Sequence, residues 1–67
     1  MVILWVNGKQ RHTNEPMDIS SFLEANGINS PYVAVAHNGV VIRREEFAQI
    51  TLQEGDALEI VSPVGGG

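Results

Sequence analysis

The residues of this chain best suited to chemistry are its last ones, where Pro63 and Val64 are followed by three glycines ending at Gly67. Glycine lacks a Cβ, so such a segment fits a channel too narrow for side chains. The terminal carboxylate, with an ordinary pKa of roughly 3.5, is ionised at neutral pH and can attack an activated phosphate or become an acyl derivative. Extended, residues 62–67 reach on the order of 20 Å. We expect this tail to enter the active site of another protein.

Other reactive side chains form no convincing catalytic set. His12 and His37 each stand at a strand end with no carboxylate or nucleophile motif beside them, so we interpret both as surface histidines. Glu45 and Glu46 follow two arginines on a turn and point apart, which is typical of a solvated charged loop. We therefore expect no catalytic residue and no metal site in this chain, which is a substrate of enzymes and not itself an enzyme.

Composition limits the class of protein. A chain of 67 residues with 43% hydrophobic residues predicts one domain, residues 1–67, with a body of 1–61 and a tail of 62–67. The net charge of −4 argues against nucleic acid as a partner. The absence of cysteine excludes a disulfide framework, and no apolar run approaches the length of a membrane span. We expect a cytoplasmic protein with no membrane contact.

Two β-hairpins are predicted from the same turn signal, Asn-Gly, which favours the type I′ turn. The first joins an apolar strand, residues 1–6, to a polar strand, residues 9–12, which we place at the sheet edge. The second joins residues 32–36 to residues 40–42. A last strand, residues 57–61, leads into the tail.

One amphipathic helix is expected at about residues 19–26. Asp18 is a good N-cap, Phe22 lies on the apolar face, Gly27 suits the C′ position and Ile28 can make the hydrophobic contact of a Schellman ending. A short helical turn at 43–47 should place Phe47 in the core.

This element order predicts an α+β protein with the ubiquitin-like β-grasp fold: a mixed sheet of about five strands, one main helix and a flexible Gly-rich tail. A single helix covers only one face of the sheet. Apolar residues on the other face, including Val61 and either Leu4 or Trp5, should then face water or a partner, and we expect a docking surface there. If Leu4 is the residue that faces outward, Trp5 is interpreted as part of the buried core.

Several stretches together resemble the ThiS family of sulfur carrier proteins of thiamine biosynthesis. They are the apolar start running into Asn7-Gly8, Val33–Ala36 leading to Asn38-Gly39, Val41–Arg43 followed by Phe47, Gly55–Val61, and the closing Gly66-Gly67. The third glycine, Gly65, departs from the family pattern, which needs only the last two.

The resemblance implies that the carboxylate of Gly67 is adenylated by a ubiquitin-activating-like enzyme and converted to a thiocarboxylate. The sulfur would then pass to thiazole synthase. ATP is used by the activating partner, and no cofactor is expected on this chain. Val61, Val64, Gly65 and Gly66 are the residues expected to contact partners.

Two alternatives stay open. The chain could be the similar small subunit of molybdopterin synthase, whose Gly-Gly end enters a partner's active site. It could also be a passive β-grasp interaction domain, with terminal glycines that are only a frayed end or an added linker.

Overall fold

The computed structural model describes residues 1–29 and 31–62 of the chain. Its elements, in order, are β1 (Val2–Val6), β2 (Lys9–Thr13), α1 (Ile19–Ala25), β3 (Ala34–His37), β4 (Val40–Ile42), the 3-10 helix η1 (Arg44–Glu46) and β5 (Ala57–Val61). The predicted order of helices and strands is therefore confirmed. The largest differences are at β3, which begins and ends later than predicted, and at β2, which extends to Thr13.

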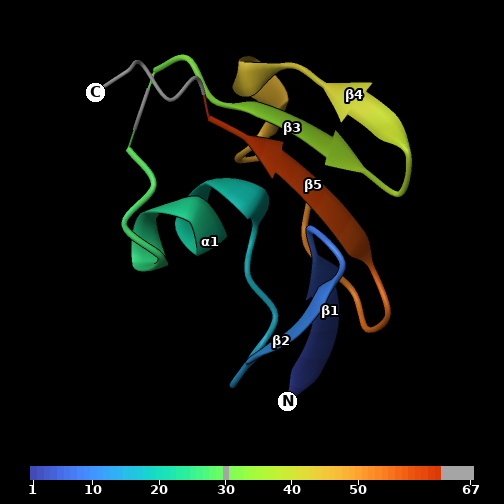
Figure 1. Cartoon of the computed structure of the whole chain (residues 1–67). Coiled ribbons are helices and arrows are strands. Elements are labelled where there is room, and N and C mark those ends of the chain that lie inside the picture. Colours follow the sequence, from blue (N-terminus) through green and yellow to red (C-terminus); the bar gives the residue numbers. More distant parts are fainter. Residues whose placement is uncertain (30, 63–67) are drawn as a thin grey trace.

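The strands form one mixed sheet in the order β2-β1-β5-β3-β4. The last strand, β5, therefore lies at the centre, parallel to β1 and antiparallel to β3 (Figure 1). The polar strand β2 is at one edge, as predicted, and β4 is at the other. The strand that leads into the tail is thus held on both sides.

The two hairpin turns have the geometry that their sequences predict. Asn7 and Gly8 have φ of 53° and 82°, and Asn38 and Gly39 have φ of 51° and 86°. A type I′ turn needs positive φ at both central residues, which asparagine tolerates and glycine favours. These turns fix the register of β1 with β2 and of β3 with β4.

Local sequence also sets both ends of α1. The Asp18 carboxylate accepts a hydrogen bond from the Ser21 amide at 3.0 Å, which caps the first turn. At the other end the amide of Ile28 donates to the carbonyl of Leu23, and Gly27 has φ of 74°. This hydrogen bond and the positive φ of Gly27 are the features of the predicted Schellman ending. The helix itself ends at Ala25, with Asn26 as the C-cap.

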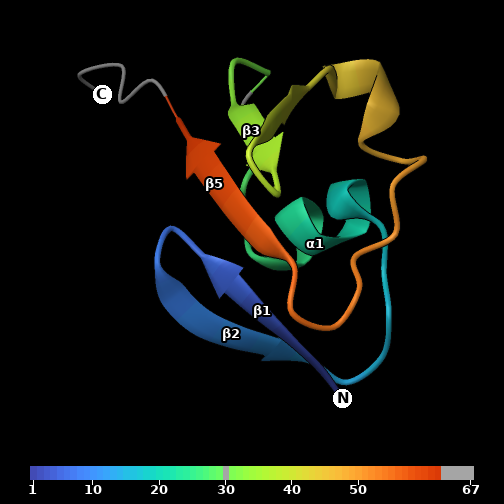
Figure 2. The ribbon, with the colours of Figure 1, turned by 90° about the vertical axis from the view of Figure 1, so that its right-hand side faces the viewer.

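The helix covers one face of the sheet (Figure 2), and the core lies between them. Residues of one parity in the central strands point to it. The buried apolar residues are Val2, Leu4, Ile19, Phe22, Leu23, Val35, Phe47, Leu52 and Leu58. Phe22 and Phe47 thus lie in the core, as predicted.

The structure resolves the choice between Leu4 and Trp5. Leu4 is completely buried, whereas Trp5 is 45% exposed on the opposite face. The interpretation of Trp5 as a core residue is therefore wrong, because adjacent residues of a strand point to opposite faces and the helix covers only the face of Leu4.

Candidate functional site

The base of the tail lies at the end of the central strand. Val61, the last residue of β5, is 64% exposed, and Ser62 is exposed after it. Of the predicted site residues, Val61 is the one that the structure describes. Val64, Gly65, Gly66 and Gly67 lie outside the described residues. The structure therefore defines the position from which the tail departs.

The sheet face opposite α1, here called the outer face, is largely apolar. Cross-strand pairs place Ala36 beside both Val41 and Glu59, and Ala34 beside Val61. Val41 is 78% exposed. These side chains line a shallow depression of about 180 Å³, and Trp5 lies on the same face on β1. From here on, the outer face means the part of this side formed by Trp5, Ala34, Ala36, Val41, Glu59 and Val61, and on β2 the same side carries the polar residues Gln10 and His12.

Glu59 gives the outer face its chemical character. It is an exposed carboxylate on the central strand, paired with Ala36 and surrounded by alanine and valine side chains. A complementary surface would be apolar and would carry a cation opposite this carboxylate. The outer face reaches the base of the tail at Val61, so a partner seated on it would also meet the departing chain. The predicted docking surface has the required exposure.

The prediction that neither histidine has a carboxylate beside it is wrong for His37. His37 does have a carboxylate neighbour, because its Nε2 lies 2.7 Å from Oδ2 of Asp56. Asp56 is 19 residues away in sequence but is brought to the end of β3 by the antiparallel pairing with β5. The Gln53 amide and the Asn38 side chain also donate to this carboxylate.

The environment of Asp56 has two opposing effects on its pKa. Burial raises the pKa, and the hydrogen bonds from His37, Gln53 and Asn38 lower it more strongly, so the net pKa lies below the ordinary value of 3.8. The carboxylate is ionised at neutral pH. Because its partners belong to the turns at the ends of β3 and before β5, we assign this cluster to fold stability.

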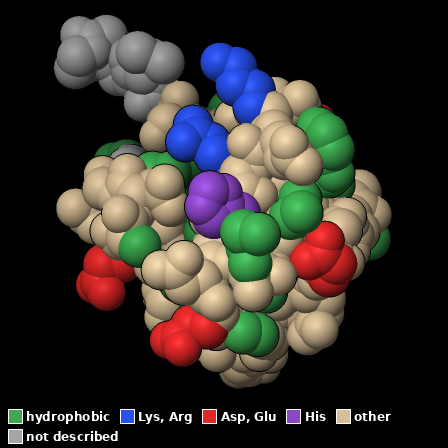
Figure 3. Space-filling view, turned by 90° about the horizontal axis from the view of Figure 1, so that it is seen from below, with side chains coloured by type: hydrophobic (Ala, Val, Ile, Leu, Met, Phe, Trp, Pro, Cys, Tyr) green, Lys and Arg blue, Asp and Glu red, His purple; other side chains and the backbone are tan. Residues whose placement is uncertain are grey.

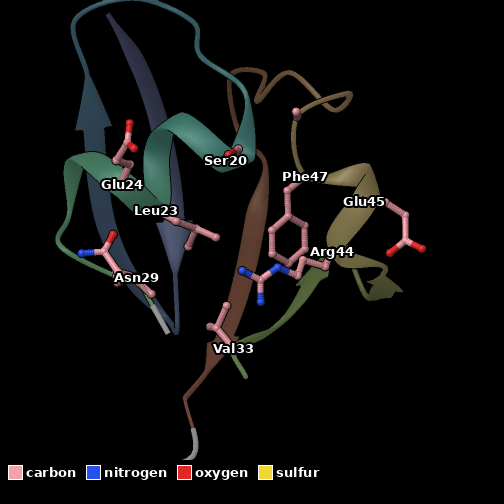
Figure 4. A pocket seen from close by; sticks show the side chains of 10 residues that line it. Ser20, Leu23, Glu24, Asn29, Val33, Arg44, Glu45 and Phe47 are labelled. Carbon is pink, nitrogen blue, oxygen red and sulfur yellow. The ribbon is translucent and has the colours of Figure 1, made fainter. Parts of the chain in front are cut away.

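A second hollow lies between α1 and η1, with a volume of about 360 Å³. Figure 4 shows Leu23 and Phe47 pointing into it, while Glu24 and Glu45 point away from each other. Arg44 crosses it and donates to the Pro31 carbonyl. Glu46, the residue considered as a partner of Glu45, instead accepts a hydrogen bond from the Arg43 amide at 2.8 Å. The walls of this hollow are mixed, with apolar side chains such as Leu23 and Phe47 beside the polar side chains of Ser20, Glu24 and Arg44.

Metal-binding clusters and membrane-spanning helices are absent from the described part of the chain. Within residues 1–29 and 31–62, no group of three or more His, Cys, Asp or Glu side chains could hold a metal ion. No helix in these same ranges is long and apolar enough to cross a membrane. On the face seen in Figure 3, basic side chains lie toward the top and acidic ones lower down, with hydrophobic side chains scattered between them.

A five-stranded mixed sheet with one helix and a chain end that leaves the central strand defines a ubiquitin-like β-grasp protein. The model of the ThiS family matches residues 4–67, and the chain belongs to this family. A crystal structure of the thiamine biosynthesis protein ThiS from Geobacter metallireducens superposes with a TM-score of 0.84 and 36% identity, covering 98% of this chain and 100% of that one. A solution structure of a thiamine biosynthesis protein from the same organism gives the same TM-score and identity over 88% of its length.

Two curated relatives show how such a sequence occurs elsewhere. A thiazole synthase of Paramagnetospirillum magneticum is 36% identical over 64 residues, which are 96% of this chain but only 20% of that protein. An uncharacterized protein, ycf40, of Trieres chinensis is 25% identical over 94% of this chain and 86% of its own length. The chain thus spans about a fifth of the length of this thiazole synthase relative.

Proposed function

We propose that this chain is a sulfur carrier whose terminal carboxylate, on Gly67, is activated and then loaded with sulfur for thiazole formation in thiamine biosynthesis. A carboxylate oxygen bonds to the α-phosphorus of ATP while pyrophosphate leaves. Sulfide supplied by a sulfur donor then attacks the acyl carbon and AMP leaves, so that the terminal carbonyl carries sulfur in place of one oxygen. An adenylating enzyme provides the ATP site, and the chain acts as a protein cosubstrate.

The observation that carries this proposal is the match to the ThiS family, which runs through residue 67 and so includes the terminal glycines. Such a match supports a functional tail over a frayed end or an added linker. The body is consistent with this role, since the central strand β5 leads directly to the tail. The absence of cysteine also leaves no thiol in the chain to attack a reactive acyl adenylate.

The outer face is the surface that we assign to docking on the adenylating enzyme. Seating this face would place Val61 against the partner, with Val64, Gly65 and Gly66 continuing into its channel. The partner surface should be apolar with a cation facing Glu59. The net charge of −4 favours a basic partner through electrostatic steering as well.

The thiamine pathway is preferred to the molybdopterin pathway because both similar solved structures are of thiamine biosynthesis proteins and a curated relative is a thiazole synthase. Incubation of the sulfur-loaded chain with thiazole synthase, and separately with the large subunit of molybdopterin synthase, tests this choice. Sulfur should be lost only to the first enzyme. Transfer only to the second would reassign the pathway without changing the chemistry at Gly67.

The adenylation step is tested by exchange of labelled pyrophosphate into ATP with the purified adenylating enzyme and magnesium. Exchange should require the chain. One added residue after Gly67 moves the carboxylate by about 3.5 Å, and an error of about 1 Å can already cost about a hundredfold in rate. Gly66→Val should also block exchange if the channel admits only glycine. Exchange at the parent rate with both variants would favour the passive interaction domain.

A further inference from the structure

The side chain of Asn7 makes an unusual contact with the strand that leads to the tail. Its Oδ1 accepts from the amide of Ile60 at 2.8 Å, and its Nδ2 donates to the carbonyl of the same residue at 3.1 Å. One side-chain amide thus satisfies both backbone groups of a residue 53 positions away. Ile60 is the second residue before Ser62, where the described part of the chain ends.

These two bonds replace the next step of the parallel ladder between β1 and β5. The regular bonds include those from the Trp5 amide to the Asp56 carbonyl and from the Asn7 amide to the Leu58 carbonyl, both within 2.9 Å. A continuing parallel strand would next offer a backbone carbonyl and then an amide to Ile60. The chain has instead turned at Asn7-Gly8 into β2, so the Asn7 side chain, which has the same donor and acceptor groups as a peptide, supplies both.

The second Asn-Gly turn provides a natural comparison. The side chain of Asn38 accepts a hydrogen bond from the backbone amide of Ala57 at 2.9 Å. The backbone amide of Asn38 donates to the carbonyl of Ala57 at 2.8 Å. Each turn asparagine therefore holds β5, with Asn38 at its beginning and Asn7 near its end. Only Asn7 lies at the end from which the tail departs.

We propose that Asn7 is a positioning residue for the tail: its side chain extends the pairing of β5 beyond the end of β1 and thereby fixes the direction in which the tail leaves the body. Without this contact, Ile60 would keep no sheet partner on the β1 side, and the end of β5 would be held by its pairing with β3 alone. This inference rests on the proposed function, since it concerns delivery of the Gly67 carboxylate to the adenylating enzyme.

The test compares the parent with Asn7→Gly, Asn7→Asp and the matched control Asn38→Gly. Glycine keeps the positive φ of either turn and removes only the side-chain bonds. Aspartate keeps the acceptor for the Ile60 amide but not the donor. Amide hydrogen exchange, measured by NMR on the free chain, reports whether these side-chain hydrogen bonds are formed. The Ile60 amide should exchange about tenfold faster in Asn7→Gly and the Ala57 amide about tenfold faster in Asn38→Gly.

Pyrophosphate exchange with the adenylating enzyme then separates positioning from general stability. Asn7→Gly should lower kcat about tenfold with KM nearly unchanged, because the outer face still docks but the carboxylate is less often in place. Asn7→Asp should restore part of this loss. Asn38→Gly should keep kcat close to that of the parent, even where its melting temperature falls as much.

The outcomes distinguish the inference from the function on which it rests. An inactive parent chain would overturn both. An active parent with an unchanged kcat for Asn7→Gly, or with equal losses for Asn7→Gly and Asn38→Gly, would overturn the positioning role alone. Unchanged exchange of the Ile60 amide in Asn7→Gly would show that the contact does not hold the strand end, and would also overturn the inference.

Discussion

Two neighbouring residues of β1, Leu4 and Trp5, should respond in opposite ways to truncation. Leu4 is completely buried, so Leu4→Ala should lower the free energy of unfolding by about 3–4 kcal/mol through lost burial and a cavity. Trp5 is 45% exposed, so Trp5→Ala should cost less stability, about 1–2 kcal/mol. Urea unfolding of the two variants measures this difference.

The two substitutions should have the opposite order of effects on the affinity for the adenylating enzyme. If the outer face docks on the adenylating enzyme, Trp5→Ala should weaken that complex at least tenfold, as exposed tryptophans at the centre of interfaces often do. Leu4→Ala, measured by calorimetry at a temperature where it is still folded, should bind nearly as the parent does. Equal affinity of Trp5→Ala and the parent would place the interface elsewhere.

Asp56 should make the fold sensitive to acid. Burial raises its pKa, but the hydrogen bonds from His37, Gln53 and Asn38 outweigh burial, so the folded pKa is below the unfolded one. A depressed pKa contributes stability that is present above the unfolded value, near 3.8, and is lost as the pH falls through the folded pKa. Asp56→Asn should therefore be less stable than the parent at pH 7, and this difference should shrink below about pH 4.

Urea unfolding at pH 7 and at pH 3 checks this prediction. Glu45→Gln, which makes the same change of charge on the exposed turn η1, is the control. A stability difference between the parent and Asp56→Asn that is the same at both pH values would show that the carboxylate gains nothing from its partners in the folded state.

At the scale of the element, α1 contributes through its apolar face. Phe22 is buried at the centre of that face, and Phe22→Ala should cost about 3–5 kcal/mol, enough to unfold much of so small a domain. Glu24, on the exposed side of the same helix, provides the control, and Glu24→Ala should change stability by no more than about 0.5 kcal/mol. A cooperative melting transition of Phe22→Ala near that of the parent would contradict this account of the core.

The elements that could be predicted from sequence are those with local signals. The Asn-Gly turns, the Asp18 cap and the Gly27 ending each depend on backbone preferences within a few residues, and all three are confirmed. The face to which Trp5 points could not be assigned, since both parities of β1 are apolar and alternation carries no information there. Only the covering helix distinguishes the two faces.

The side-chain contacts between strands were harder to predict because they join residues far apart in sequence. The Asn-Gly signal explains the turn at Asn7, but the pairing of its side chain with Ile60 depends on β5 lying beside β1. The contact between His37 and Asp56 likewise needs the antiparallel pairing of β3 with β5. The position of Glu59 at the centre of the outer face also follows only from the strand order.

For the whole molecule, we propose that the body folds on its own and that the tail carries the reacting group. Deletion of Gly66 and Gly67 removes no side chain, so the melting temperature should stay within a few degrees of the parent value. Thermal unfolding followed by circular dichroism measures this. A large fall in the melting temperature would mean that the last two residues help to hold the fold, which contradicts the separation.

The division into body and tail stays a prediction in one respect, because residues 63–67 lie outside the described part of the chain. The functional part of this prediction is that the reacting group of the protein is its own terminal carboxylate. This claim concerns one functional group on one residue, Gly67, and mass spectrometry can locate a change at that residue directly.

The most direct measurement is the mass of the C-terminal peptide after incubation with ATP, magnesium, the adenylating enzyme and a sulfur donor. We expect the exchange of one oxygen for one sulfur, located at Gly67 by fragmentation, and no exchange in Gly66→Val or without ATP. A parent chain that keeps its terminal carboxylate unchanged while a known ThiS protein is loaded under the same conditions would show that this chain is not a sulfur carrier.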